Sequence, residues 1–248
     1  AYKHNFFFYS INRRLFKARV SKSDIPVSWK GDDALKIVSI GQSHIDAAWL
    51  WRKEDTKTKK INYTFDRALM HMKMYEDRDF TYTQNQVVYY DWVKKFYPEL
   101  WEGIQRRFSE GRWEVVDGAW VESDVNIPSA ESLIHQRLIG QYWYLENFGI
   151  MSDIAWCDDV FGFPFQLPQI LAKCNAKYFL TNKFCYNDTN IWPYHSMIWR
   201  GPDGKSDLLF AWNQHKNNWQ KYLKTWRERS VLVDDGEEVI LNYMSDFE

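Results

Sequence analysis

Short runs of β-branched and apolar residues alternate along the chain with segments whose apolar residues recur every three or four positions. The run from Lys36 to Gly41 predicts a buried strand. From about Thr56 to Tyr75 the apolar spacing predicts an amphipathic helix. Further strands are predicted over residues 80–83, 113–116, 154–157, 177–181 and 208–212, and residues 238–243 are predicted to form a strand or a helix.

Helices are predicted between these strands. They include a pair broken at Pro98 with a stop at Gly111, a helix that follows Ser129 and ends near Gly149, and a short helix over residues 166–174. Strands that alternate with helices are typical of β-α-β units on a mostly parallel sheet. Because six or seven such units favour closure, we expect an α/β fold with a seven-stranded (β/α) barrel whose active site lies at the carboxyl ends of the strands.

The chain shows no internal repeat, low-complexity tract or Pro/Gly-rich linker that would mark an internal boundary. Residues 1–35 are therefore expected to form a lead-in segment, and residues 36–248 one barrel domain.

Composition narrows the functional classes. With 45% apolar and 26% charged residues, the chain has enough hydrophobic material to fold around a core. A net charge of −1 gives no electrostatic reason to expect a nucleic-acid partner, and no apolar run approaches the roughly 18 residues of a membrane helix. Three cysteines without a C-x-x-C pair indicate neither a disulfide framework nor a thiolate metal site. We therefore expect a soluble, cytoplasmic protein without a membrane partner.

Candidate chemistry begins just after the first predicted strand, at His44-Ile45-Asp46. In extended backbone, residues two apart project to the same side, so this imidazole and carboxylate can converge on one point. Zinc accepts both ligand types. The competing interpretation is an ordinary hydrogen-bonded pair within a loop.

Carboxylates follow two other predicted strands. Asp158 and Asp159 come directly after residues 154–157, where one of them could complete a metal cluster or cap the following helix. After the third strand, Glu122 and Asp124 repeat the two-residue spacing, and they either bind substrate hydroxyls or solvate a loop.

The stretch from Gly41 to Trp51 resembles the opening motif of glycoside hydrolase family 38 α-mannosidases. Other matching motifs keep the order of that family. They are Gly111-Arg112-Trp113-Glu114, Trp120-Val121-Glu122-Ser123-Asp124, Trp156-Cys157-Asp158-Asp159-Val160-Phe161-Gly162, Leu167-Pro168-Gln169-Ile170, and Asn182-Lys183 with Asn187-Asp188.

The resemblance implies a seven-stranded barrel that holds one zinc ion, with His44, Asp46 and Asp159 as three of its four ligands. It also implies that Asp159 is the nucleophile of a retaining reaction and that Trp49 supports the sugar ring. Substrate contacts are further expected from Glu122, Asp124 and Lys183, which lie in matching motifs. A His/carboxylate set could also take cobalt or manganese.

The sequence departs from the family pattern at Asp158, where proline is usual, and at His135, where arginine is common. The acid/base aspartate and the fourth zinc ligand are expected from segments after Glu248, so the isolated chain should bind zinc weakly and turn over poorly. Neither His135, His195 nor His215 lies in a matching motif.

We therefore expect the amino-terminal part of a zinc-dependent, retaining α-mannosidase. Its expected partners are a mannose-containing oligosaccharide, the remainder of a longer chain and further copies in a homo-oligomer. Two alternatives stay open: a metal-dependent carbohydrate deacetylase and a non-catalytic sugar-binding subunit.

Overall fold

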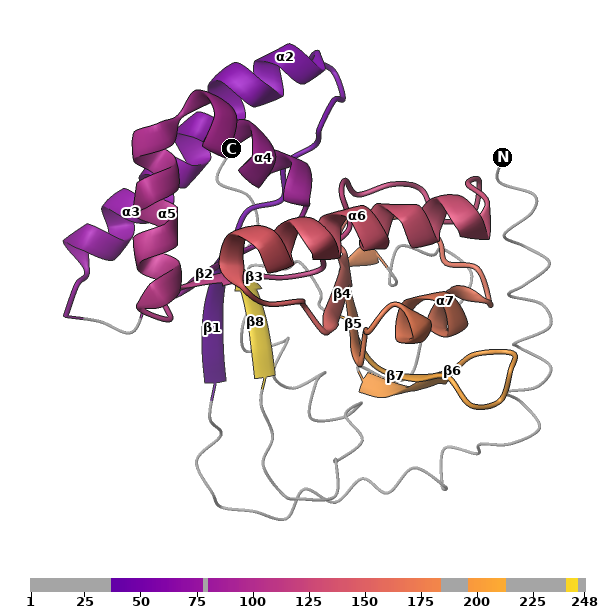
Figure 1. Cartoon of the computed structure of the whole chain (residues 1–248). Helices are drawn as coiled ribbons and strands as arrows, with labels where there is room; N and C mark the ends of the chain where they lie inside the picture. The colour runs from indigo at the N-terminus through magenta and orange to yellow at the C-terminus, as the bar shows by residue number, and fades with distance from the viewer. Residues whose placement is uncertain (1–36, 78–79, 184–195, 213–239, 245–248) are drawn as a thin grey trace, which may run out of the picture.

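The computed structural model describes residues 37–77, 80–183, 196–212 and 240–244 (Figure 1). The expected lead-in segment 1–35, the matching pair Asn187-Asp188, and the histidines His195 and His215 lie outside the described residues.

The described chain alternates strands with helices, as the periodicity predicts. The strands are β1 (Ile37–Gln42), β2 (Tyr82–Gln84), β3 (Trp113–Val115), β4 (Ile154–Cys157), β5 (Tyr178–Thr181), β6 (Ser196–Arg200), β7 (Asp207–Trp212) and β8 (Ile240–Met244). The helical segments are α2 (Lys53–Asp55), the π-helical turn η1 (Thr56–Lys60), α3 (Ile61–Met74), α4 (Val87–Phe96), α5 (Pro98–Ser109), α6 (Ala130–Phe148) and α7 (Leu167–Lys173). None of the described helices is long and apolar enough to cross a bilayer.

Local signals in the sequence set several helix ends. Pro98 is the first residue of α5, where its missing N–H is not needed. Ser129 caps α6 by accepting a hydrogen bond from the N–H of Ser132 at 3.2 Å. Gly149 ends the same helix in the left-handed conformation, with φ 74°. These three boundaries follow the predicted ones closely.

The strands form two sheets, in the orders β3-β2-β1-β8 and β4-β5-β7-β6. All recorded pairs are parallel except β6 with β7, which is antiparallel. The prediction of an α/β fold with mostly parallel strands is confirmed. A closed seven-stranded barrel is not confirmed, because within the described residues neither sheet closes and no β-ladder joins β3 to β4. The strand β6, absent from the predicted elements, turns back along β7 and forms an edge of its sheet.

Side chains link the two sheets where β3 and β4 approach each other. The carboxylate of Asp117 accepts a hydrogen bond from the backbone N–H of Trp156 at 3.3 Å, and Asn85 Nδ2 donates to the carbonyl of Trp156 at 3.5 Å. Val116, Trp156 and Leu180 pack together beside these contacts. We call this junction the seam.

Two hydrophobic clusters support the two sheets. Helices α3, α4 and α5 gather about the sheet that contains β1, and α7 lies beside β7 (Figure 1). The long helix α6 runs between the two groups, with Tyr144 in the first cluster and Leu133 in the second. Large aromatic side chains fill the first cluster, including Phe65, Tyr90 and Trp113, all nearly inaccessible to solvent. Much of the aromatic excess in the composition is therefore core packing.

Candidate metal centre

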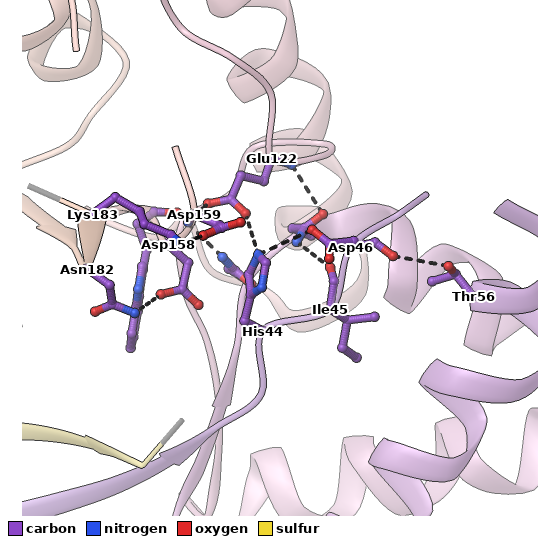
Figure 2. A network of polar contacts seen from close by, with 12 residues as sticks. His44, Ile45, Asp46, Thr56, Glu122, Asp158, Asp159, Asn182 and Lys183 are labelled. Carbon is purple, nitrogen blue, oxygen red and sulfur yellow. Dashed lines mark hydrogen bonds and ion pairs between the residues drawn. The ribbon is translucent and has the colours of Figure 1, made fainter. Parts of the chain in front are cut away.

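Loops at the carboxyl ends of β1, β3, β4 and β5 bring polar side chains to one place (Figure 2). The loop after β1 carries His44 and Asp46, and the loop after β4 carries Asp159. Each of these three residues offers one ligand atom, and the three atoms lie within 4.8 Å of one another. The structure thus brings together the three residues that the sequence analysis named as metal ligands.

The donor set fits a divalent transition metal. An imidazole nitrogen and two carboxylate oxygens are ligand types that zinc accepts, and a tetrahedral site would need one further ligand. Since all three side chains are partly accessible, an ion from solution could reach them.

Glu122 lies inside this cluster. Its Oε2 is 2.9 Å from Nε2 of His44, and its Oε1 accepts a hydrogen bond from the backbone N–H of Asp159 at 2.9 Å. The side chain is only 10% exposed. Of the two carboxylates predicted after the third strand, this one joins the centre.

Negative charge dominates the surroundings of His44. Burial lowers the pKa of His44, but the hydrogen bond that its imidazole donates to Glu122 and the charges of Glu122, Asp158 and Asp46 raise it more, so that the pKa rises from 6.5 to about 9. Such a cluster of carboxylates is an electrostatic environment that favours a cation.

Hydrogen bonds hold the loop after β1 in place. The carbonyl of Ile45 accepts from Gln86 Nε2 at 3.0 Å and from the hydroxyl of Tyr89. The carbonyl of Asp46 accepts from the hydroxyl of Thr56 at 3.1 Å. Thr56 is buried and begins the π-helical turn η1, an irregularity often found at functional sites.

Asp158 belongs to a buried layer beneath the cluster. Its carboxylate accepts hydrogen bonds from Gln42 Nε2 at 3.3 Å and from Asn182 Nδ2. The alternative that Asp158 or Asp159 caps the following helix is wrong, because α7 begins at Leu167 with Gln166 at its N-cap position. Asp158 is thus a buried carboxylate with two polar partners.

Lys183 follows β5 and reaches Asp159, with which its ammonium group forms an ion pair. The same ammonium lies 5.5 Å from the ring centroid of Phe161. Lys183 therefore joins the cluster from a fourth loop.

Trp49 and Asp124 lie apart from the cluster's polar contacts. Trp49 is 65% exposed, and its ring meets that of Trp51 edge-on at 5.3 Å between centroids. Asp124 is exposed and accepts hydrogen bonds from the N–H groups of Asn126 at 2.7 Å and Ile127 at 2.8 Å. The loop-stabilising interpretation of Asp124 is the one that matches these contacts.

Sequence reasoning missed Gln86. It has no motif of its own, and its part in the site depends on a backbone φ of 64° that places its amide between two loops. The available signal is the polar run Gln84-Asn85-Gln86 at the carboxyl end of β2.

Comparisons with known proteins agree with this geometry. Residues 34–235 match the family model described as Glycosyl hydrolases family 38 N-terminal domain. Alpha-mannosidase 2C1 of Mus musculus is 37% identical over 179 residues, which cover 72% of this chain and 17% of the relative. Alpha-mannosidase of Saccharomyces cerevisiae is 32% identical over 200 residues, covering 80% of this chain and 18% of the relative. The chain thus spans less than a fifth of the length of these relatives.

A solved structure shows the same fold. The crystal structure of an alpha-mannosidase from Enterococcus faecalis superposes with a TM-score of 0.69 at 17% identity, covering 86% of this chain and 25% of the other.

Proposed function

The chain belongs to glycoside hydrolase family 38, and from this premise we propose that it is the amino-terminal part of a zinc-dependent, retaining α-mannosidase. The observation that carries the proposal is the convergence of His44, Asp46 and Asp159, whose ligand atoms lie within 4.8 Å of one another. Two of these residues follow β1 and the third follows β4, so residues distant in sequence meet at one point.

In this proposal His44, Asp46 and Asp159 hold the zinc ion. When bound, the ion supplies positive charge that keeps carboxylates ionised and binds sugar hydroxyls.

Asp159 acts as the nucleophile. Its carboxylate attacks the anomeric carbon of mannose while the bond from that carbon to the leaving oxygen breaks, and the leaving oxygen takes a proton from a second carboxylic acid. Water, deprotonated by the same group, then attacks the anomeric carbon and releases Asp159 as a carboxylate. Two inversions give net retention. The ion pair with Lys183 holds the side chain of Asp159 in place before attack.

The substrate is a mannose-containing oligosaccharide. The exposed ring of Trp49 offers a face on which a sugar can stack, and Lys183 is a second proposed sugar contact. The contact of Asp124 with sugar hydroxyls stays a prediction. The proposal includes a cytoplasmic setting, assembly with the remainder of a longer chain, and a homo-oligomeric state, which native mass spectrometry would check.

Metal analysis provides the first test. The chain should take up about one zinc per molecule after dialysis against the metal, whereas His44→Ala should retain less than about a tenth of that, because a ligand is lost. The matched control is His135→Ala. His135 is exposed on α6, and its Nε2 lies 3.4 Å from Oε1 of Glu131, away from the metal centre. Equal zinc content in all three proteins would contradict the metal centre.

Covalent trapping tests the nucleophile and separates the alternatives. A fluorinated mannosyl inhibitor should add one glycosyl mass to the peptide that contains Asp159 when the full-length protein is assayed. The Asp159→Asn variant should gain no mass. Release of acetate from an acetylated sugar, with no adduct, would instead identify a deacetylase.

A further inference from the structure

Glu122 connects two of the proposed metal ligands through its carboxylate. One oxygen lies 2.9 Å from Nε2 of His44, and the other accepts the backbone N–H of Asp159 at 2.9 Å. Because both oxygens are engaged within the cluster and the side chain is nearly buried, little of the carboxylate is left for a sugar hydroxyl.

We propose that Glu122, together with Gln86, is a positioning residue that fixes the geometry of the metal centre, instead of a contact for the sugar. This inference rests on the proposed function, since it concerns the same centre.

Gln86, which follows β2, links Glu122 back to the loop after β1. Its Oε1 accepts the backbone N–H of Glu122 at 3.3 Å, and its Nε2 donates to the carbonyl of Ile45 at 3.0 Å. Gln86 is buried and has a left-handed φ of 64°. Backbone in this region is costly for a residue other than glycine, and it persists where the surroundings hold it in place. Here the two amide hydrogen bonds do so.

Gln86 and Glu122 therefore form a brace that spans the loops after β1, β3 and β4. His44 and Asp159 lie in loops that follow strands of different sheets. Among the described residues, no β-ladder joins β3 to β4. The relative placement of these two ligands consequently depends on side-chain contacts, of which Glu122 supplies one to each. Residues that orient a metal ligand through an atom that does not bind the metal are worth about 10- to 100-fold in metal affinity. For His44 this requires that Nδ1 binds the ion, because Nε2 is the nitrogen that contacts Glu122.

The negative charge of Glu122 should increase zinc affinity, as its hydrogen bonds to the ligand loops should. A buried carboxylate beside the imidazole adds negative potential where the cation would bind, so its removal weakens binding on electrostatic grounds as well. The contributions of charge and of position can be separated with Glu122→Gln. This variant keeps an acceptor for the N–H of Asp159 but carries no charge.

The test measures zinc affinity by competition with a chromophoric chelator. We expect Glu122→Ala to bind zinc about 10- to 100-fold more weakly than the unmodified chain, Glu122→Gln to show a smaller loss, and Gln86→Ala to lose about 10-fold. Asp124→Asn is the matched control, because it removes a carboxylate from the same loop without touching the cluster, and it should leave zinc affinity unchanged. Circular dichroism and thermal unfolding establish that each variant is folded.

A second readout needs no metal. In the metal-free chain, the backbone amide of Asp159 should exchange its hydrogen about 10-fold faster in Glu122→Ala than in the unmodified chain, because its acceptor is gone. A role confined to general stability would raise exchange throughout the protein and would not single out this amide.

The inference would be overturned if Glu122→Ala bound zinc as tightly as the unmodified chain or more tightly. A raised KM for a mannoside in the same variant would then identify Glu122 as a sugar contact. In both cases His44→Ala would still lose its zinc, and the proposed function would stand. If His44→Ala kept its zinc as well, the metal centre of the proposed function would fall, and the inference with it.

Discussion

Asp117 and Arg137 form an ion pair that is almost completely buried, with Oδ1 of the carboxylate 3.1 Å from Nη1 of the guanidinium. Burial raises the pKa of Asp117 to about 6, although the charge of Arg137 and the N–H of Trp156 lower it. Arg137 also donates to the carbonyl of Ser152 at 3.5 Å. The seam therefore depends on a carboxylate whose charge is tolerated only because a cation faces it.

Replacement of Arg137 by Met should expose this dependence. Removing one partner of a buried pair costs about 3–5 kcal/mol of unfolding free energy, which urea denaturation at pH 7.5 would measure. The matched control is Arg200→Met. Arg200 pairs with Asp207 at 2.7 Å on the surface, where solvent screens the charges, so the loss of unfolding free energy should be much smaller than in Arg137→Met.

The same variant has a defined pH dependence. Without Arg137 the folded-state pKa of Asp117 lies further above its unfolded value of 3.8, so the folded variant holds a proton at pH values where the unmodified protein has released it. When the folded pKa of a carboxyl group is raised, its contribution to the free energy of unfolding falls as pH rises from the unfolded pKa to the folded pKa. In Arg137→Met the folded pKa is higher, so this fall continues to a higher pH. The difference between the two proteins should therefore shrink by at least about 1 kcal/mol between pH 7.5 and pH 5. Parallel stability curves would contradict this assignment.

At the scale of elements, α6 approaches the turn after β3 so closely that only glycine fits. A Cβ at Gly140 would lie 2.2 Å from the carbonyl oxygen of Gly118, which is backbone and has little freedom to move. The helix is thereby set against the loop that leads to Glu122.

We expect Gly140→Ala to destabilise the fold by about 2–3 kcal/mol, because backbone must shift to admit the methyl group. Gly149→Ala serves as the control. Gly149 has a left-handed φ but no atom within 4 Å of an added Cβ, so its cost should be about 1 kcal/mol. Urea unfolding of both variants checks the order, and an equal cost would show that α6 can move away from the turn.

Elements with a strong local signal were predictable from sequence. Residues 154–157 form β4 as predicted, and the positions of His44 and Asp159 after their strands indicated the candidate centre. β6 was missed because five residues carry little periodicity, although the turn Gly201-Pro202-Asp203-Gly204 that follows it is typical of a hairpin. The seam between β3 and β4 depends on tertiary packing, and the contacts of Gln86 depend on its left-handed backbone. A pattern of hydrophobic positions encodes neither.

On the scale of the whole molecule, the proposed metal joins two sheets that are otherwise linked by side chains. His44 and Asp46 belong to the loop after β1, and Asp159 to the loop after β4. A ligand that binds only the folded state stabilises it by about 2.7 kcal/mol at a concentration of 100 Kd. Zinc at that level should raise the unfolding temperature by about 5–10 °C.

Differential scanning calorimetry with and without zinc measures this increase. Asp46→Ala should lose it, and His135→Ala, which lies outside the centre, should keep it. An equal increase in Asp46→Ala would mean that zinc acts elsewhere on the protein.

The reversed direction of β6 has a practical consequence. Because β7 runs parallel to β5, the turn between Arg200 and Asp207 lies at the amino-terminal edge of its sheet, opposite the loops that carry Asp159 and Lys183. Asp203 closes this turn by accepting from the N–H groups of Lys205 and Ser206, and the side chain of Lys205 is exposed. A dye or surface linker attached at Lys205 would therefore leave the opposite rim, with Asp159 and Lys183, open to solvent.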